Sequence, residues 1–313
     1  MREIAAGRQD DPNMRNKILF YCGMPVGLAS ADAFPSMALM ALSAYVKQKG
    51  FEAELLLNRH SDEEIGKMLA NTLAVGFSVY TGNGIDHSLR MARKIRALDP
   101  AITLVWGGYH PSLEPDRTLS NPFVDYVVRG EGEETLAELL MFLQKRGPDS
   151  ADKITGLSHK AGDKNIHNPG RGPLKMDELP PYDYDLYAHS IRKNQSNEVV
   201  EYISSRGCPF NCKFCANAAF TREQGGYRTF SNERIISDIQ RIVTDYQPKQ
   251  IYIWDDTFFF KKERLACFLD EYKKRNFSFK WFVQARADFV AAADDSLLKQ
   301  LKETNIARVL LCI

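Results

Sequence analysis

The chain has 313 residues, of which 44% are hydrophobic and 26% are charged, a balance typical of a globular protein with room for two domains. Its formal net charge of +1 at pH 7 argues against a dedicated nucleic-acid binder, which usually carries a basic excess. No apolar run reaches the ~18 residues of a membrane-spanning helix, so we expect no membrane span.

The N-terminal part predicts one domain. Residues 1–16 lack the apolar core of a signal peptide and are expected to form a disordered lead-in. From 17 to 145, strand-like and helix-like segments alternate. Strands are expected at 17–22, 52–57, 73–79, 102–106 and 124–128, and helices at 35–49, 62–70, 85–98 and up to residue 144. This alternation predicts an α/β fold with a doubly wound parallel sheet, which binds ligands at the carboxyl ends of its strands.

The C-terminal part predicts a second, incomplete unit. Residues 146–198 are rich in Gly, Pro, Asp and Lys, and are expected to form a linker with a small hairpin around 154–160. Further strands are expected at 199–204, 250–254, 280–285 and 307–312, with helices at 232–246, 261–276 and 295–303. Four such units do not close a barrel. We therefore expect residues 199–313 to be the N-terminal part of a truncated β/α barrel, and the chain to be a fragment.

Three of the six cysteines, Cys208, Cys212 and Cys215, follow the spacing C-x3-C-x2-C. Three thiolates on a four-iron cluster leave one iron open to a small chelating molecule. Structural zinc is the alternative, but it prefers four protein ligands, and no nearby Cys or His completes such a set. The other cysteines are scattered and are expected to be small buried residues. This pattern indicates a reducing compartment, namely the cytoplasm.

The run RGCPFNCKFC at 206–215 resembles the cysteine loop of the radical S-adenosylmethionine superfamily. The resemblance implies a 4Fe-4S cluster on the loop after the first strand of a partial barrel. It also implies that the open iron binds the amine and carboxylate of S-adenosylmethionine, whose reductive cleavage yields a 5′-deoxyadenosyl radical.

Five residues near this loop are candidate contacts for S-adenosylmethionine. Phe214 is positioned to cover the adenine. Asp255 and Asp256 end a barrel strand, where a carboxylate can accept a hydrogen bond from the methionyl ammonium. Arg286 ends the next strand and can pair with the methionyl carboxylate, and Gln284 flanks it. The alternative is that these residues are ordinary loop packing or solvated strand ends.

Three runs that follow N-terminal strands, at 76–83, 105–111 and 127–134, resemble the cobalamin-binding domain found upstream of many radical S-adenosylmethionine enzymes. Small residues there would let a flat macrocycle lie on the strand ends. The candidate cobalamin contacts are Ser78, Tyr80, Thr81, Gly82, Asn83, Gly107, Gly108, Tyr109, Gly130, Glu131 and Gly132. The alternative is a Rossmann-like module that binds no cobalamin.

The early loop at 22–35 contains no histidine, unlike the Asp-x-His-x-x-Gly run of cobalamin mutases. The lower face of cobalt would therefore lack a histidine ligand, which suits a methyl carrier. We interpret His110 as a loop residue that contacts the edge of the cofactor or solvent.

Together these features resemble the cobalamin-dependent radical S-adenosylmethionine enzymes. The resemblance implies a methyltransferase that acts on an unactivated carbon or phosphorus centre of a small molecule or natural-product intermediate. Flavodoxin or ferredoxin would supply electrons. A cyclase or rearrangement enzyme is a second hypothesis, and a non-catalytic cofactor-binding fragment is a third. The sequence assigns no catalytic residue and indicates no nucleic-acid partner.

Overall fold

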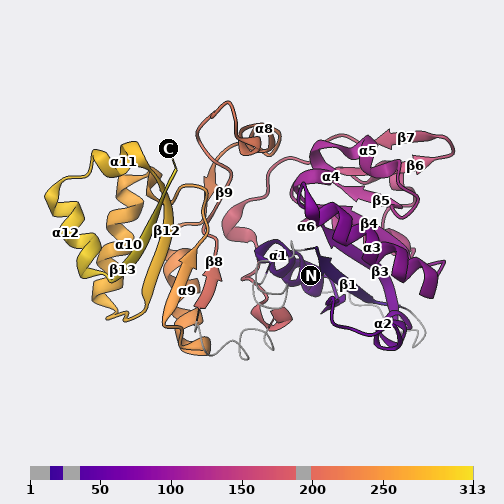
Figure 1. Ribbon diagram of the computed structural model, residues 1–313, viewed down its shortest axis with the longest axis horizontal. Helices are drawn as coiled ribbons and strands as arrows, with labels where there is room; N and C mark the ends of the chain where they lie inside the picture. The colour runs from indigo at the N-terminus through magenta and orange to yellow at the C-terminus, as the bar shows by residue number, and fades with distance from the viewer. Residues whose placement is uncertain (1–14, 24–35, 188–198, 313) are drawn as a thin grey trace, which may run out of the picture.

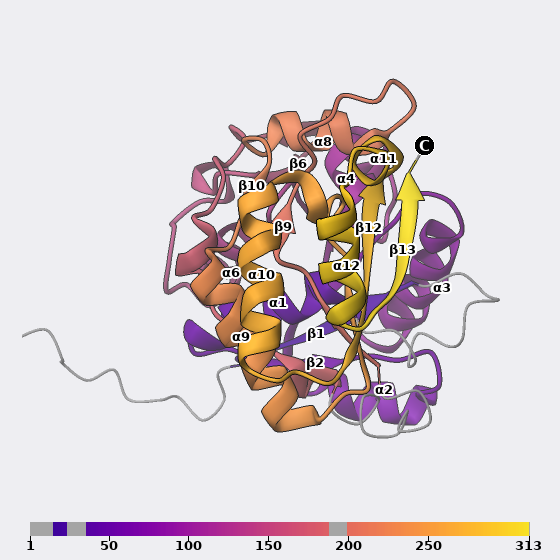
Figure 2. The same cartoon turned by 90° about the vertical axis from the view of Figure 1, so that its left-hand side faces the viewer.

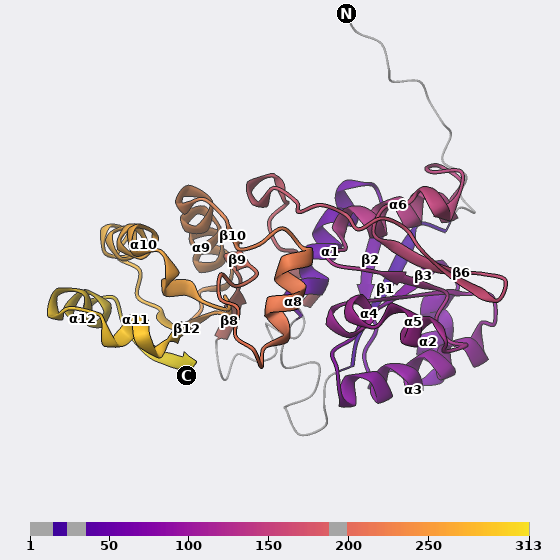
Figure 3. The same cartoon turned by 90° about the horizontal axis from the view of Figure 1, so that it is seen from above.

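The computed structural model describes residues 15–23, 36–187 and 199–312, which form two α/β units side by side (Figures 1 and 3). Nearly all of the predicted lead-in at 1–16, and most of the loop at 22–35, lie outside the described residues. Within the described ranges, no helix is both long and apolar enough to span a bilayer.

The N-terminal unit is built on a seven-stranded sheet in the order β2-β1-β3-β4-β5-β6-β7. Its strands are β1 (Lys17–Cys22), β2 (Glu52–Leu55), β3 (Thr72–Ser78), β4 (Thr103–Gly107), β5 (Tyr126–Val128), β6 (Leu157–Ala161) and β7 (Lys164–His167). The first five strands pair in parallel, which confirms the predicted doubly wound sheet. Their carboxyl ends therefore lie at one edge of the sheet, where ligands bind.

The predicted hairpin is displaced and belongs to the main sheet. It spans residues 157–167 rather than 154–160, and β6 pairs antiparallel with β5. This pairing satisfies backbone groups that β5 would otherwise expose at the edge of the sheet. Part of the predicted linker is thus structurally part of the N-terminal unit.

Helices cover both faces of this sheet. They are α1 (Met37–Gln48), α2 (Asp62–Leu69), α3 (Asn83–Leu98), α4 (Tyr109–Leu113), α5 (Pro115–Leu119) and α6 (Glu133–Leu143). Apolar residues of α1 and α6 pack in one core and those of α2 and α3 in the other, as in a doubly wound fold. Ser36 and Ser61 cap α1 and α2, which explains where these helices begin. The short α4 and α5 were not predicted.

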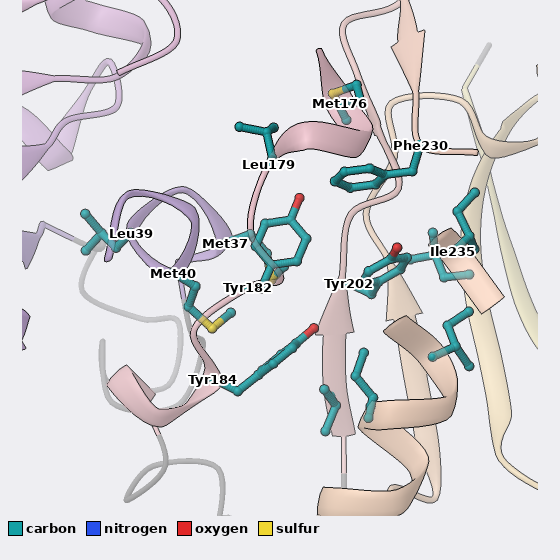
Figure 4. Close-up of a cluster of buried hydrophobic side chains, with 14 of the residues drawn as sticks. Met37, Leu39, Met40, Met176, Leu179, Tyr182, Tyr184, Tyr202, Phe230 and Ile235 are labelled. Carbon is teal, nitrogen blue, oxygen red and sulfur yellow. The ribbon is translucent and has the colours of Figure 1, made fainter. Parts of the chain in front are cut away.

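A tyrosine-rich segment of the predicted linker packs between the two units (Figure 4). Tyr182 donates a hydrogen bond to the Ile203 carbonyl at 3.1 Å, and Tyr184 donates to the Glu201 carbonyl at 2.7 Å. Both rings are buried, and Met40 of α1 belongs to the same core. The described part of the linker, up to Tyr187, is therefore packed between the units, and one hydrophobic core includes residues of both units and of this segment.

The C-terminal unit contains a four-stranded parallel sheet in the order β13-β12-β11-β8. The strands are β8 (Val199–Tyr202), β11 (Gln250–Ile253), β12 (Lys280–Arg286) and β13 (Ile306–Cys312), and the helices are α9 (Asn232–Tyr246), α10 (Lys262–Lys274), α11 (Ala287–Ala291) and α12 (Asp295–Glu303). Figure 2 looks onto α9, α10 and α12, which cover the outer face of this sheet. The order of the strands confirms a partial β/α barrel.

Side chains alternate between the two faces of this sheet. Tyr202, Ile251 and Ile253 belong to the core beneath the helices. Because successive strand residues point to opposite faces, Glu201 and Tyr252 face the inner side. That inner side is turned toward the N-terminal unit, so its residues are placed to contact a ligand held there.

Candidate functional site

A cavity of about 880 Å³ lies between the two units. The carboxyl ends of the N-terminal strands form one wall, and the inner face of the C-terminal sheet forms the other. All of the predicted cobalamin contacts line it except Gly82 and Asn83, which begin α3. The opposite wall includes Glu201, Ile203, Ser205, Arg206, Gly207, Tyr252, Trp254 and Asp256.

Two consecutive glycines line the cavity where β4 ends: Gly107 is the last residue of the strand and Gly108 follows it. Gly108 has φ +97°, and a Cβ there would lie 3.1 Å from the backbone nitrogen and oxygen of Val79. A side chain would therefore strain the turn and press on the neighbouring strand end. At Gly107, a Cβ would lie 3.3 Å from the Val128 carbonyl oxygen. The small residues keep this part of the wall flat, in accord with the sequence argument.

Three aromatic side chains, Tyr80 and Tyr109 of the N-terminal unit and Phe220 of the helix after the cysteine loop, lie next to one another. The rings of Tyr80 and Tyr109 lie 6.2 Å apart, and those of Tyr109 and Phe220 lie 4.5 Å apart. Burial raises the pKa of Tyr109, and the nearby carboxylate of Asp256 raises it further. Phe220 belongs to α8 (Ala216–Glu223), which lies between the units in Figures 1 and 3. The sequence analysis missed this residue because it expected no helix at 216–223, directly after the cysteines.

The cysteine loop lies between the short strand β9 (Ser205–Arg206) and α8. Gly207 has φ +75°, and a Cβ there would lie 2.8 Å from Thr221 Cγ2, so the turn into the loop favours glycine. The Cys208 amide donates to Thr221 Oγ1 at 3.2 Å, and the Cys215 amide donates to the Cys212 carbonyl at 3.1 Å. These contacts set the path of the loop.

The three thiols of this loop are partly exposed and unpaired. Burial raises the pKa of Cys208, and the nearby Asp256, Cys212 and Cys215 raise it further, so the three sulfurs lie close enough to interact. Across the described ranges, no three His, Cys, Asp or Glu side chains form a preassembled metal site. The ligand role of the three cysteines therefore stays a prediction, and the thiols would have to turn toward one another to bind a cluster.

Asp255 does not reach the cavity. It is fully buried, its Oδ1 accepts from the Ser204 and Ser205 amides at 2.6 and 3.2 Å, and its Oδ2 lies 2.9 Å from Arg264 Nη2. With both oxygens occupied, it has no group to offer to S-adenosylmethionine, and the geometry does not support the contact predicted for it. Its contacts instead fix the chain where β8 leads into the cysteine loop.

Asp256, the next residue, lines the cavity and accepts a hydrogen bond from Asn217 Nδ2 at 2.8 Å. Burial raises its pKa, and the charge of Asp255 raises it further. A cationic amine placed beside Asp256 would offset that cost. Of the two predicted carboxylates, this is the one that can contact a ligand.

The other three predicted S-adenosylmethionine contacts lie around the cysteine loop or on β12. The Arg286 guanidinium lies 4.1 Å from the Phe210 ring centroid and 3.8 Å from Cys212 Sγ, and it pairs with Asp288 at 2.7 Å. Phe214 is 84% exposed, so its ring is open to stack on a ligand. Gln284 is partly buried on β12 and does not line the cavity. Their roles remain predictions.

Glu201 is a cavity residue that sequence reasoning missed. It lies on β8, is 8% exposed, and is hydrogen-bonded to Trp254. Its charge also acts on Tyr80 and Tyr187 across the cavity. Burial raises the pKa of Glu201 to about 7, although the bond from Trp254 opposes the shift. The signal available in the sequence was an acidic residue inside an otherwise apolar strand, VVEY.

This raised pKa predicts a pH-dependent stability. As pH rises from about 4.5 to about 7, the unfolded chain loses the Glu201 proton while the folded chain keeps it, so the free energy of unfolding falls, by on the order of 3 kcal/mol. The variant Glu201→Gln should remove this dependence. In urea denaturation, the free energy of unfolding of Glu201→Gln minus that of wild type should be larger at pH 8 than at pH 5. The control is Glu63→Gln, at an exposed position on α2, for which the difference from wild type should be about the same at both pH values. An equal difference at both pH values would contradict the assignment.

His110 lies on α4 and does not line the cavity. The interpretation of His110 as a loop residue is therefore wrong, and the geometry does not support its contact with the edge of the cofactor. The predicted absence of a histidine from the lower cobalt face concerns the loop at 22–35, most of which lies outside the described residues.

Known proteins match the N-terminal unit alone and the two units together. A family model described as a B12 binding domain matches residues 25–140. An uncharacterized methyltransferase of Pyrococcus horikoshii is 31% identical over 231 residues, covering 73% of this chain and 49% of that protein. The anaerobic magnesium-protoporphyrin IX monomethyl ester cyclase of Rubrivivax gelatinosus is 23% identical over 303 residues, covering 90% of this chain and 52% of the cyclase.

A solved structure shows the same fold across both units. The cobalamin-dependent S-adenosylmethionine radical enzyme OxsB, with aqua-cobalamin and S-adenosylmethionine bound, matches with a TM-score of 0.74 at 20% identity, covering 96% of this chain and 44% of OxsB. Residues 25–140 thus match a B12 binding domain, and both units together have the fold of a cobalamin-dependent S-adenosylmethionine radical enzyme. It spans about half the length of the curated relatives that it matches.

The residues of this chain fit cobalamin on one side of the cavity and a 4Fe-4S cluster on the other. A volume of about 880 Å³ is near the upper end of the ~300–1,000 Å³ found for ligand sites, and Gly107 and Gly108 leave room for a flat ring. On the other side, three thiols within eight residues match the soft donors that iron–sulfur clusters require. Asp256 lies near both the cavity and Cys208.

Proposed function

We propose that this chain forms the cobalamin-binding and cluster-binding parts of a radical S-adenosylmethionine methyltransferase that acts on an unactivated carbon or phosphorus centre. The observation that carries the proposal is the cavity lined by both units: the strand ends predicted to contact cobalamin face Asp256 and the start of the cysteine loop. A small-molecule or natural-product substrate fits this arrangement. Flavodoxin or ferredoxin would supply electrons, and the free cysteines fit a reducing compartment such as the cytoplasm.

Each wall would have a distinct task. The loops after β3, β4 and β5 would hold the cobalamin against the carboxyl ends of these strands. Cys208, Cys212 and Cys215 would ligate three irons, while Asp256 would bind the methionyl ammonium and Arg286 its carboxylate. When bound, these cofactors supply a 5′-deoxyadenosyl radical and a transferable methyl group. The chain itself would orient both and exclude water, which protects a radical from side reactions.

A direct test is cofactor loading followed by reduction. Protein reconstituted anaerobically with iron, sulfide and hydroxocobalamin is expected to bind one cobalamin and one 4Fe-4S cluster, and to release 5′-deoxyadenosine when given S-adenosylmethionine and dithionite. Iron, cobalt and nucleoside content are the measurements. Bound cofactors without 5′-deoxyadenosine would favour the third hypothesis, a non-catalytic cofactor-binding fragment. Failure to bind cobalamin would contradict the proposal.

A cyclase is the second candidate, and the match to a cyclase over 90% of this chain favours keeping it. The two differ in the fate of the methyl group. With methyl-labelled S-adenosylmethionine and a substrate, label in the product would support methyl transfer. A ring-closed product without label would support the cyclase.

A further inference from the structure

The acidic loop, residues 130–133, extends from the N-terminal unit to the base of the cysteine loop. Arg206, two residues before the first cysteine, pairs with Glu133, and its Nη1 lies 3.2 Å from Glu131 Oε2. Arg228, beyond the cysteine loop, pairs with Glu131. The two arginines face each other across the antiparallel strands β9 and β10 (Arg228–Thr229). Two carboxylates of one unit thus pair with arginines on either side of the segment 207–227, which contains the cysteine loop and α8 of the other unit.

The acidic loop also contacts α8, the helix that follows the cysteines. Gln224 Oε1 accepts a hydrogen bond from the Glu131 amide at 3.0 Å. One turn earlier on the same helix, Thr221 accepts from the Cys208 amide. Through these two hydrogen bonds, the last turn of α8 connects the acidic loop to the first cysteine.

These ion pairs are largely shielded from water. The side chains of Glu131 and Glu133 are 9% and 5% exposed, and those of Arg206 and Arg228 are 18% exposed. Burial alone would lower the pKa of Arg206, but Glu133 and Glu131 outweigh it and the pKa is raised. Buried pairs with several hydrogen bonds define a geometry far better than pairs on a solvated surface do.

We propose that the acidic loop is a positioning element for the cluster: Glu133 and Glu131 fix Arg206 and Arg228, and thereby the spacing of the two ends of the segment 207–227, which carries the three cysteines. The inference rests on the proposed function, because it assumes that the three cysteines bind a cluster. The competing explanation is that these pairs only join the two units. Groups that orient metal ligands indirectly typically change metal affinity by about 10–100-fold when they are removed.

The test compares Glu133→Gln, Arg206→Gln, the double variant and Arg206→Lys with Glu134→Gln. Glu134 is the matched control, since it lies in the same first turn of α6 but pairs with Arg171 and is 38% exposed. For each reconstituted full chain, we would measure the cluster retained against a chelator, the electron paramagnetic resonance spectrum of the reduced cluster, and the melting temperature.

We expect Glu133→Gln to retain its cluster about tenfold less well than wild type and to change the spectrum, while Glu134→Gln matches wild type. The double variant should regain melting temperature because no unpaired buried charge remains, yet its cluster retention should stay low. Arg206→Lys keeps the charge and so the fold, but a single ammonium cannot contact both carboxylates in the same way, and retention should again be low.

Two results would overturn the inference while leaving the proposed function intact: variants with the retention and spectrum of wild type, or a double variant that regains retention together with stability. If wild type and Glu134→Gln themselves take up no cluster, the proposed function fails, and the inference fails with it.

Discussion

Replacing Cys212 with alanine is expected to lower the iron retained by the reconstituted protein by at least about tenfold, and to abolish reductive cleavage of S-adenosylmethionine. Removal of groups that only orient a metal ligand costs about 10–100-fold in affinity, so the loss of a direct ligand should cost no less. Iron and sulfide content and 5′-deoxyadenosine release are the measurements. Cobalamin binding should be unchanged, because its predicted contacts lie on the other wall of the cavity.

The matched control is Cys267→Ala. Cys267 is also a free, partly buried cysteine, but it lies on α10, away from the cysteine loop. The Cys267→Ala variant should retain as much iron as wild type and release as much 5′-deoxyadenosine. If Cys212→Ala also retained iron and sulfide like wild type, the cluster assignment would be wrong, and the alternative of a cofactor-binding fragment without radical chemistry would gain support.

Asp255→Ala is expected to lower the free energy of unfolding by about 3–5 kcal/mol, measured by urea denaturation. The substitution would leave the Arg264 guanidinium buried without its carboxylate, and the Ser204 and Ser205 amides without their acceptor. Arg264 is 5% exposed, so water has little access to replace the hydrogen bond that the Asp255 carboxylate accepts.

An exposed ion pair provides the comparison. Asp86→Ala removes an i,i+4 pair with Arg90 on α3, whose side chains are 69% and 63% exposed, and it should change stability by no more than about 0.5 kcal/mol. Equal losses for Asp255→Ala and Asp86→Ala would show that the buried network contributes little. The contrast matters for function, because the Asp255 network fixes the segment that enters the cysteine loop.

The two predictions separate two jobs done by neighbouring parts of the site. Cys212 is predicted to bind the cluster, whereas Asp255 fixes the path of the chain that leads into the cysteine loop. The acidic loop adds a third contribution from the other unit. The cluster site is thus predicted to depend on both units, and the isolated barrel part would lack the partners of Arg206 and Arg228.

The local sequence pattern was sufficient to predict many of the helices and strands of this protein. The alternation of strands and helices predicted the parallel pairing of the first five strands and the partial β/α barrel, because hydrophobic periodicity and helix caps act over a few residues. Helices α9 and α12 have the bounds that the sequence indicated. The spacing of Cys208, Cys212 and Cys215 within one loop, and the glycines at the strand ends, are likewise local features. Together with the family resemblance, they indicated the cofactors and located nine of the residues that line the cavity on the side of the N-terminal unit.

Only the tertiary structure decided which polar groups face the cavity. Asp255 and Asp256 are adjacent, yet one is enclosed by Ser204 and Arg264 while the other lines the cavity, since neighbouring side chains point in different directions. Likewise, the carboxylate of Glu131 is taken up by Arg206 and Arg228, which lie 75 or more residues away in the sequence. Partners so distant leave no periodic signal, because their pairing depends on how the two units pack together.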